Sequence, residues 1–214
     1  MEQNIKIAVI GGIGKSGKYL VKQLLEQGFH FNILVRNPEK FKVQSPQAEI
    51  IHGNVNDPAA VHALLEGCSA VISTLGLGIP ASEKNIFTTG TGNILEAMKA
   101  HGIRRYLVTT GLNVDAPADR KSPQTVFATD WMKQNYPVTT ADKQEEYAML
   151  AASDADWTLV RLPMIKETDE SGEIAVSLED CPGDQISATS LARFLISQLA
   201  DHEYVKRSPF IANK

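Results

Sequence analysis

Short runs of apolar residues alternate along the chain with longer stretches in which apolar residues recur every three or four positions. The short runs are typical of strands that are buried on both faces of a parallel sheet, and the spaced stretches are typical of helices with one inward face. Six strands are predicted, at Ile5–Ile10, Phe29–Arg36, Glu49–Gly53, Ala70–Thr74, Arg105–Thr110 and Asp156–Pro163. Helices are predicted to begin near Gly17, Pro58, Asn93, Ala141 and Ala188.

Strands that alternate with helices predict an α/β fold, a doubly wound parallel sheet with helices on both faces. The 214 residues are enough for one such domain and too few for two of ordinary size. We expect the regular half of the sheet in residues 1–110, and a small substrate-side cap in residues 111–214. The stretch Gly111–Tyr136 contains several prolines and predicts a looser segment, and Leu75–Pro80 predicts a glycine-bearing loop.

The first predicted strand ends in the glycine-rich stretch Gly11–Gly17, which raises two alternatives for a phosphate-binding loop. A nucleotide-hydrolase loop needs Gly, four spacers, then Gly-Lys and a short hydroxyl residue. If Lys15 and Ser16 close that motif, its first glycine is replaced by Val9, and in the other frame Tyr19 replaces the hydroxyl residue. The dinucleotide pattern G-x-G-x-x-G is complete, and it lies between a strand and a helix, as that kind of site requires.

Charge and cysteine content narrow the choice of partner. The formal net charge is −4, from 21 basic and 25 acidic residues, without a basic run, so no nucleic-acid partner is expected. No apolar run reaches membrane-spanning length, and no secretory signal is recognisable, so we expect a soluble, cytoplasmic protein without a membrane partner. Cys68 and Cys181 lie in no metal-ligand spacing, so no metal site is predicted.

Six segments in a fixed order carry a resemblance that covers nearly the whole chain. They read "GGIGKSG", "LVRNPEK", "GNVNDP", "VISTLG", "GNILEAMKAHGIRRYLVTTG" and "DWTLVRLP". Together they resemble the atypical short-chain dehydrogenase/reductase group, whose members include NmrA-like regulators and biliverdin reductase B/flavin reductase-like proteins. The resemblance implies a Rossmann-type sheet of about six or seven strands that binds NAD(P).

The resemblance also implies which residues bind the cofactor. The pyrophosphate loop would be formed by Gly11, Gly12, Ile13, Gly14, Lys15, Ser16 and Gly17. Arg36 stands where an acidic residue would bind the ribose of NAD, so it favours NADP over NAD, although it could also be an ordinary solvated cation. Asn54 would lie next to the adenine or would be only a turn residue. Ser73, Thr74, Leu75 and Gly76 would run beside the cofactor or form only a strand-end turn.

Catalysis in this group commonly uses a Ser or Thr, a Tyr and, four residues later, a Lys. Thr110 matches the first position and Lys143 the last, but Thr139 stands where the tyrosine is expected. An alkyl hydroxyl lacks the accessible ionisation of a phenol. Tyr147 lies one turn beyond Lys143 and is interpreted as a core aromatic residue. Thr110 could be a plain strand-end hydroxyl, and Lys143 a surface cation.

Three functions are compatible with this pattern. The first is an NADPH-dependent oxidoreductase that transfers hydride to a small-molecule acceptor such as a flavin or a quinone. The second is a catalytically silent NADP sensor of the NmrA type, whose bound state a partner protein reads; a large exposed apolar patch would favour it. A sugar-nucleotide epimerase or dehydratase is a weaker alternative, because its usual tyrosine is missing. The sequence leaves the oligomeric state open.

Overall fold

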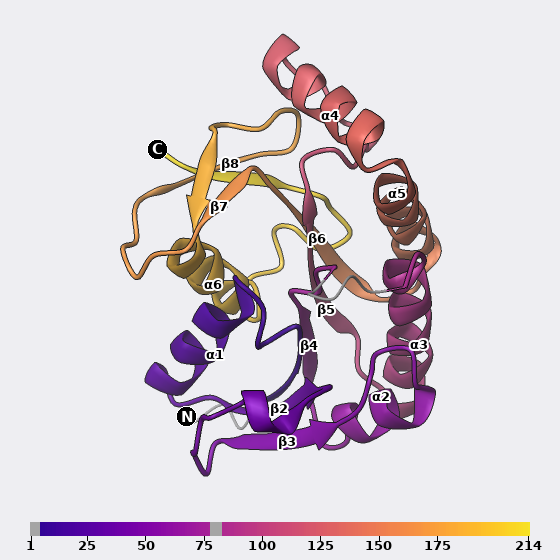
Figure 1. Cartoon of the computed structure of the whole chain (residues 1–214), viewed down its shortest axis with the longest axis vertical. Coiled ribbons are helices and arrows are strands. Elements are labelled where there is room, and N and C mark those ends of the chain that lie inside the picture. Colours follow the sequence, from indigo (N-terminus) through magenta and orange to yellow (C-terminus); the bar gives the residue numbers. More distant parts are fainter. Residues whose placement is uncertain (1–4, 78–82) are drawn as a thin grey trace.

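The computed structural model describes residues 5–77 and 83–214, and within them the chain forms one long sheet between two layers of helices (Figure 1). The strand order is β3-β2-β1-β4-β5-β6-β10-β8, and β7 pairs with β9 in a small second sheet. Neighbouring strands of the long sheet are parallel except β10 and β8. The predicted doubly wound parallel sheet is therefore confirmed.

The strands are short, and their bounds follow the apolar runs. They are β1 Lys6–Ile10, β2 His30–Val35, β3 Ala48–His52, β4 Ala70–Ser73, β5 Arg105–Gly111, β6 Asp156–Leu162, β7 Met164–Lys166, β8 Ile174–Ser177, β9 Gln185–Ser187 and β10 Phe210–Asn213. The α-helices are α1 Gly17–Glu26, α2 Pro58–Leu65, α3 Ile86–His101, α4 Pro123–Asn135, α5 Pro137–Ala152 and α6 Ala188–Ser197. A short 3₁₀ helix, η1, spans Pro38–Lys40.

Each face of the sheet has its own hydrophobic core. Helices α1 and α6 pack on one face, and α2, α3 and α5 pack on the other (Figure 1). On β5, Tyr106 and Val108 point into the α3–α5 layer, whereas Leu107 points toward α6. Side chains alternate along a strand, so the two layers are fixed by the sequence of each buried strand.

The stretch expected to be loose contains a regular helix, α4, so that expectation is wrong. Ser122 caps the helix by accepting a hydrogen bond from the Thr125 backbone N–H, and Pro123 occupies its first turn. This proline therefore begins a helix instead of interrupting one. The buried side chains of α4 are Thr125 and Thr129, so the helix has no apolar stripe that a periodicity argument could detect.

The long sheet continues beyond residue 110, where strands β6, β10 and β8 extend it. Strands β7 and β9 form the separate small sheet, and α4 lies at one end of the molecule (Figure 1). The strands that the sequence did not predict have three or four residues each, too few for a pattern. Helix α3 begins at Ile86, seven residues before the predicted start, and the predicted loop Leu75–Pro80 lies outside the described residues from position 78 on.

Candidate functional site

The glycine loop lies at the point of the sheet where the chain reverses its direction of winding. From β1 the chain proceeds to β2 and β3 on one side and then crosses to β4 on the other. Gly11 follows β1 with φ +76°, and a Cβ atom there would lie 2.5 Å from the carbonyl oxygen of Thr74, which follows β4. Ligands of open α/β sheets bind at such a switch point.

The remaining glycines of the loop divide into packed and open positions. A Cβ on Gly17 would lie 2.0 Å from the Gly11 carbonyl oxygen, and one on Gly12 would lie 2.5 Å from Ile33 Cδ1. These glycines let the helix and the strands approach each other closely. Gly14 is exposed, and its N–H donates to the Gly11 carbonyl at 2.9 Å. Of these three glycines, Gly14 is the one that faces outward, where a ligand can approach the backbone.

Helix α1 begins at this loop without a side-chain cap. Its N-cap residue, Ser16, makes no capping hydrogen bond, and its first turn contains no acidic residue. By contrast, Asp57, Ser122 and Ser187 cap α2, α4 and α6 with side-chain oxygens. The first amides of a helix need an acceptor, and the positive end of the helix dipole favours an anion. The start of α1 therefore fits a pyrophosphate.

Ile13 and Lys15 are exposed at the tip of the loop, beside the partly buried Ser16. An acidic residue, Glu167, lies next to this tip. Its carboxylate pairs with Lys18 Nζ at 2.7 Å and with Lys15 Nζ at 4.0 Å. The ammonium groups of both lysines thus lie where the segment after β7 contacts the glycine loop. The sequence did not predict this contact.

Arg36 and Asn54 follow β2 and β3 at the same edge of the sheet as the glycine loop. Arg36 is exposed, and His52 Nε2 lies 3.1 Å from its carbonyl oxygen. Asn54 Oδ1 accepts a hydrogen bond from the backbone N–H of Asn56 at 3.2 Å, which is the turn role considered for it. The positions of Arg36 and Asn54 are compatible with their predicted contacts to the cofactor, and these contacts stay predictions.

The segment after β4 borders the glycine loop on its other side. Ser73 and Thr74 are buried, and Thr74 Oγ1 donates to the carbonyl oxygen of Ile10 at 3.2 Å. Ser73 Oγ accepts a hydrogen bond from the Leu75 N–H at 3.4 Å. Gly76 is exposed, with open space where a side chain would begin. The four residues thus border the glycine loop where β1 and β4 end.

The two predicted catalytic residues belong to one layer of the fold. Thr110 lies two residues after Val108 on β5 and therefore points into the α3–α5 layer. Its Oγ1 is buried and has no hydrogen-bond partner among the described residues. Lys143 is half-buried on α5, and its Nζ lies 4.9 Å from the centre of the Phe87 ring at the start of α3. Burial lowers the pKa of Lys143, while Glu146 and Asp142 raise it.

Thr139 and Tyr147 lie on α5, one turn before and one turn after Lys143. Thr139 is half-buried on α5, one turn before Lys143. The Tyr147 ring stands edge-on to Trp157, with ring centres 6.0 Å apart, and packs against the core. Burial raises its pKa, which makes the phenol a weaker acid. Its interpretation as a core aromatic residue is confirmed.

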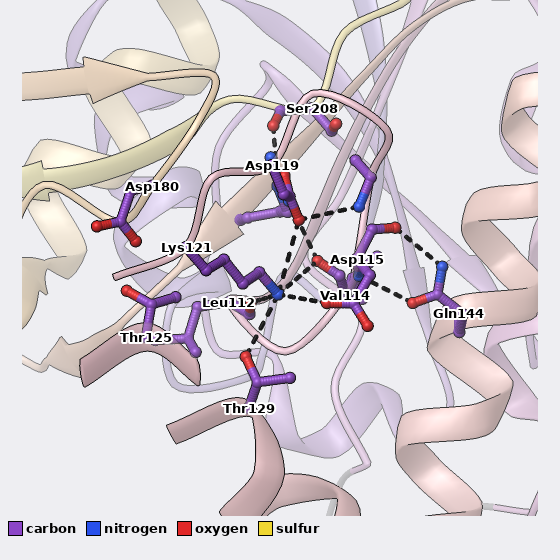
Figure 2. A network of polar contacts seen from close by, with 12 residues as sticks. Leu112, Val114, Asp115, Asp119, Lys121, Thr125, Thr129, Gln144, Asp180 and Ser208 are labelled. Carbon is purple, nitrogen blue, oxygen red and sulfur yellow. Dashed lines mark hydrogen bonds and ion pairs between the residues drawn. The ribbon is translucent and has the colours of Figure 1, made fainter. Parts of the chain in front are cut away.

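A network of charged side chains holds the segment that follows β5 (Figure 2). Lys121 Nζ lies 2.7 Å from Asp115 and 3.7 Å from Asp119, and it donates to the Leu112 carbonyl and to Thr129. Arg161, fully buried on β6, pairs with Asp119 at 2.6 Å. The network satisfies its own charges, so it holds the fold together and offers no free acid to a substrate.

Two polar residues that sequence reasoning missed lie close to the site. Asn113 is buried after β5, and its Nδ2 has no partner within the described part of the chain. Glu146 is 2% exposed on α5, and its Oε2 is likewise without a partner among the described residues. Both residues are marked by the burial of their polar side chains by segments distant in the chain. Such burial cannot be recognised from a single sequence.

Two further observations concern alternatives to a dinucleotide site. In residues 5–77 and 83–214, no three His, Cys, Asp or Glu side chains gather in a way that could hold a metal ion. Over the same residues, no helix combines the length and the apolar character needed to cross a membrane. The residues around the glycine loop fit a dinucleotide, because they provide an open glycine, uncapped amides and nearby cations.

Relatives with curated names share part or most of the chain. An uncharacterised chloroplastic protein of Arabidopsis thaliana is 24% identical over 208 residues, which are 91% of this chain and 70% of that protein. The photosystem II assembly factor Ycf39 of Guillardia theta is 30% identical over 112 residues, which are 51% of this chain but only 36% of the relative.

Solved structures share the fold over nearly the whole chain. A short-chain dehydrogenase/reductase from Veillonella parvula in complex with NADP has a TM-score of 0.74 at 17% identity, over 98% of this chain and 94% of that one. The anaerobilin reductase ChuY from Escherichia coli O157:H7 has a TM-score of 0.77 at 16% identity, over 97% of each chain. A sequence family described as NAD(P)H-binding matches residues 11–202. The chain therefore belongs to this NAD(P)H-binding family, with a Rossmann fold and NAD(P)H as the cofactor.

Proposed function

We propose that the protein is an NADPH-dependent oxidoreductase that transfers hydride to a flavin- or quinone-like acceptor. The observation that carries this proposal is a pair of polar groups on the α3–α5 side of the sheet. Thr110 offers a buried hydroxyl without a partner among the described residues, and Lys143 offers an amine on the same side of the sheet, but the phenol expected between them is replaced by Thr139.

The chemistry follows from what these groups can and cannot do. A bound NADPH supplies the hydride. The Thr110 hydroxyl can donate a hydrogen bond to an oxygen that gains negative charge, and the Lys143 ammonium can hold a ribose hydroxyl and stabilise nearby negative charge. A positioned general acid typically contributes roughly 10²- to 10⁴-fold to a rate, and no such acid is present at position 139. Acceptors that delocalise the incoming negative charge depend least on such a general acid.

The preference for NADPH over NADH belongs to the same proposal. Arg36 is exposed at the end of β2, where a guanidinium can bind a 2′-phosphate through two parallel hydrogen bonds. An acidic residue at this position would repel that phosphate. The cytoplasm stays the expected location, although the Arabidopsis relative is named chloroplastic.

Oxidation of NADPH can be followed by its absorbance with three acceptor classes: quinones, flavins and simple ketones. We expect turnover with quinones or flavins and very slow reduction of ketones. Thr110→Ala and Lys143→Ala should lower turnover or cofactor affinity, and Tyr147→Phe, the matched control for a phenol, should change little. Rapid ketone reduction that disappears in Tyr147→Phe would contradict the assignment.

A catalytically silent NADP sensor is the second candidate, and one surface favours it. Helix α4 and the start of α5 carry an exposed apolar face, which we call the α4 face, made of Val126, Phe127, Trp131, Tyr136 and Val138. Contiguous apolar surface of this kind marks interaction sites for partner proteins. The Ycf39 relative is named an assembly factor, and the match covers about half of this chain. Tight NADPH binding without turnover of any acceptor would favour the sensor.

A further inference from the structure

A line of polar side chains crosses the layer between the sheet and the helices α3 and α5. It starts at the buried Tyr106 hydroxyl on β5. The Tyr106 hydroxyl lies 3.4 Å from Thr91 Oγ1 on α3, and Thr91 donates to Glu146 Oε1 on α5 at 2.7 Å. The line thus joins β5 to α5, one turn from Lys143.

Glu146 is the end of this line, and its hydrogen bonds are incomplete. Thr91 satisfies Oε1, but Oε2 is buried without a partner among the described residues. A buried carboxylate needs several donors or a nearby cation. Burial accordingly raises the pKa of Glu146 to about 7, while the Thr91 hydrogen bond and the charge of Lys143 oppose this increase.

The neighbouring carboxylate, Asp142, is already engaged. Its oxygens accept hydrogen bonds from the Phe87 N–H at 2.9 Å, the Thr88 N–H at 3.1 Å and the Thr88 hydroxyl. It therefore caps the start of α3 from α5, where the N-cap residue Asn85 makes no capping hydrogen bond of its own. Of the two acids beside Lys143, Glu146 is the one with an uncommitted oxygen.

The groups that face this pair from the neighbouring elements α3 and β5 are hydroxyls. From α3 comes the hydroxyl of Thr91, and from β5 comes the Tyr106 phenol, whose pKa burial raises. From α5 itself come Asp142 and Lys143. The protonation of the cluster therefore depends on Glu146, whose pKa burial raises, and on Lys143, whose pKa burial lowers.

We propose that Glu146 is a positioning residue that acts through Lys143, keeping its amine charged at the cofactor site. Glu146 and Lys143 are three residues apart on α5 and therefore neighbours on its surface. Lys143 Nζ lies over the Phe87 ring in a buried environment, and among the described residues the acids that stabilise its charge are Glu146 and Asp142. The inference rests on the part of the proposed function that makes this a dinucleotide site that binds NADPH. It does not require that the protein reduces an acceptor.

The decisive variant is Glu146→Gln, with Glu145→Gln as the matched control. Glutamine keeps the size of the side chain and can still accept the Thr91 hydrogen bond, but it carries no charge. Glu145 is exposed on the same helix. We expect the wild type, Glu145→Gln and Glu146→Gln to bind NADPH equally at pH 6. At pH 8.5 only Glu146→Gln should bind weaker, by about 10-fold, because one lost ion-pair or charge-assisted contact changes affinity by about 1.4 kcal/mol.

A double variant tests whether the effect passes through the lysine. Arginine keeps its charge throughout this pH range. In Lys143→Arg, the further change Glu146→Gln should therefore leave the pH dependence of NADPH binding unchanged. If Glu146→Gln instead weakens binding equally at both pH values, or in the Lys143→Arg background as well, the carboxyl is only structural and the proposal is wrong.

Thr91→Val provides a second route if Glu146→Gln does not fold. It removes the hydroxyl that opposes the raised pKa of Glu146, so Glu146 should stay neutral to a higher pH and NADPH binding should weaken between pH 6 and 8.5 more than in the wild type. An unchanged profile would overturn the proposal. Because binding is measured, a protein that binds NADPH but reduces nothing would refute the oxidoreductase and leave this inference standing.

Discussion

The segments that follow β1 and β5 leave the sheet at the same edge, but they are built in opposite ways. After β1 the chain uses glycines, and helix α1 begins with no side chain to accept its first amides. After β5 the chain uses charged residues, and Lys121 and Arg161, which are buried, pair with Asp115 and Asp119 (Figure 2). The first segment leaves its helix amides without a side-chain cap, whereas the charged side chains of the second pair with one another.

This difference explains why the cofactor is easier to assign than the reaction. A preformed anion site with open backbone defines its ligand through geometry. A segment that neutralises its own charges gives no indication of a substrate, because it leaves no acid or base for one. Helix α5, which carries Thr139 where the phenol is expected, likewise uses its acidic residues inside the fold. Asp142 caps α3, and Glu146 accepts a hydrogen bond from Thr91.

The largest effect is expected from breaking the charged segment. Asp119→Ala should lower the free energy of unfolding by about 3 to 5 kcal/mol, because it leaves the buried guanidinium of Arg161 unpaired. The side chain of Arg161 is 0% exposed and that of Asp119 12%. The matched control is Asp169→Ala, which removes an exposed ion pair with Lys22 and should change stability by at most about 1 kcal/mol. Urea unfolding measures both, and equal losses would show that the buried pair does not stabilise this segment.

The next effect concerns the glycine segment, where binding should change more than stability. Gly14→Val should weaken NADPH binding at least about 100-fold, or 2.7 kcal/mol, because a branched side chain would fill the space above the exposed backbone. Its nearest internal contact would be the Gly11 carbonyl oxygen, 3.1 Å from the Cβ, so only a small local shift is needed.

Gly28→Ala is the opposite control. Gly28 has φ +79° at the end of α1, with open space around it, so alanine there should destabilise the fold by about 1 kcal/mol without affecting binding. Calorimetric titration with NADPH and urea unfolding separate the two quantities. Full NADPH binding by Gly14→Val would rule out this loop as the pyrophosphate site.

How much the sequence could predict follows the same contrast between local and distant interactions. The glycine turn, the Asp57 cap and the buried strands depend on residues close together in the chain, and they were predicted correctly. Helix α4 was missed because its inward residues are threonines. The pairing of Arg161 with Asp119 joins residues 42 positions apart, and no periodic pattern reports it.

Glu146 illustrates the same limit within the candidate site. Its carboxyl is buried because Thr91 of α3 packs against α5, 55 residues away in the chain. From the sequence alone, Glu145 and Glu146 are equivalent acidic residues on a helix. Only the packing of α3 makes one of them a solvated side chain and the other a buried acid.

A smaller effect is expected for the choice between the two dinucleotides. Arg36→Glu should weaken NADPH binding by about 10- to 100-fold, the range of one charge-assisted contact, and leave NADH binding nearly unchanged. Arg120→Glu, at an exposed arginine far along the chain that pairs with Glu179, is the control and should change neither affinity. Titrations with both dinucleotides provide the comparison. A wild type that binds NADH as tightly as NADPH would refute the role assigned to Arg36.

The smallest effect is expected within α4, between its exposed side and its buried side. Phe127 is 73% exposed, so Phe127→Ser should change the free energy of unfolding by no more than about 0.5 kcal/mol. Thr129 is buried on the same helix and accepts a hydrogen bond from Lys121 Nζ at 3.3 Å, so Thr129→Val should destabilise the protein by about 1 kcal/mol.

Removing an aromatic ring should therefore matter less than replacing a hydroxyl by a methyl group, the reverse of what a core-facing helix would show. Urea unfolding of the two variants at several protein concentrations is the measurement. If Phe127→Ser is the more destabilising change, and increasingly so at high protein concentration, a second copy of the chain covers the α4 face in solution. If Thr129→Val lowers the free energy of unfolding more than Phe127→Ser at every protein concentration, the inward side of α4 is held by polar contacts and its aromatic side is free.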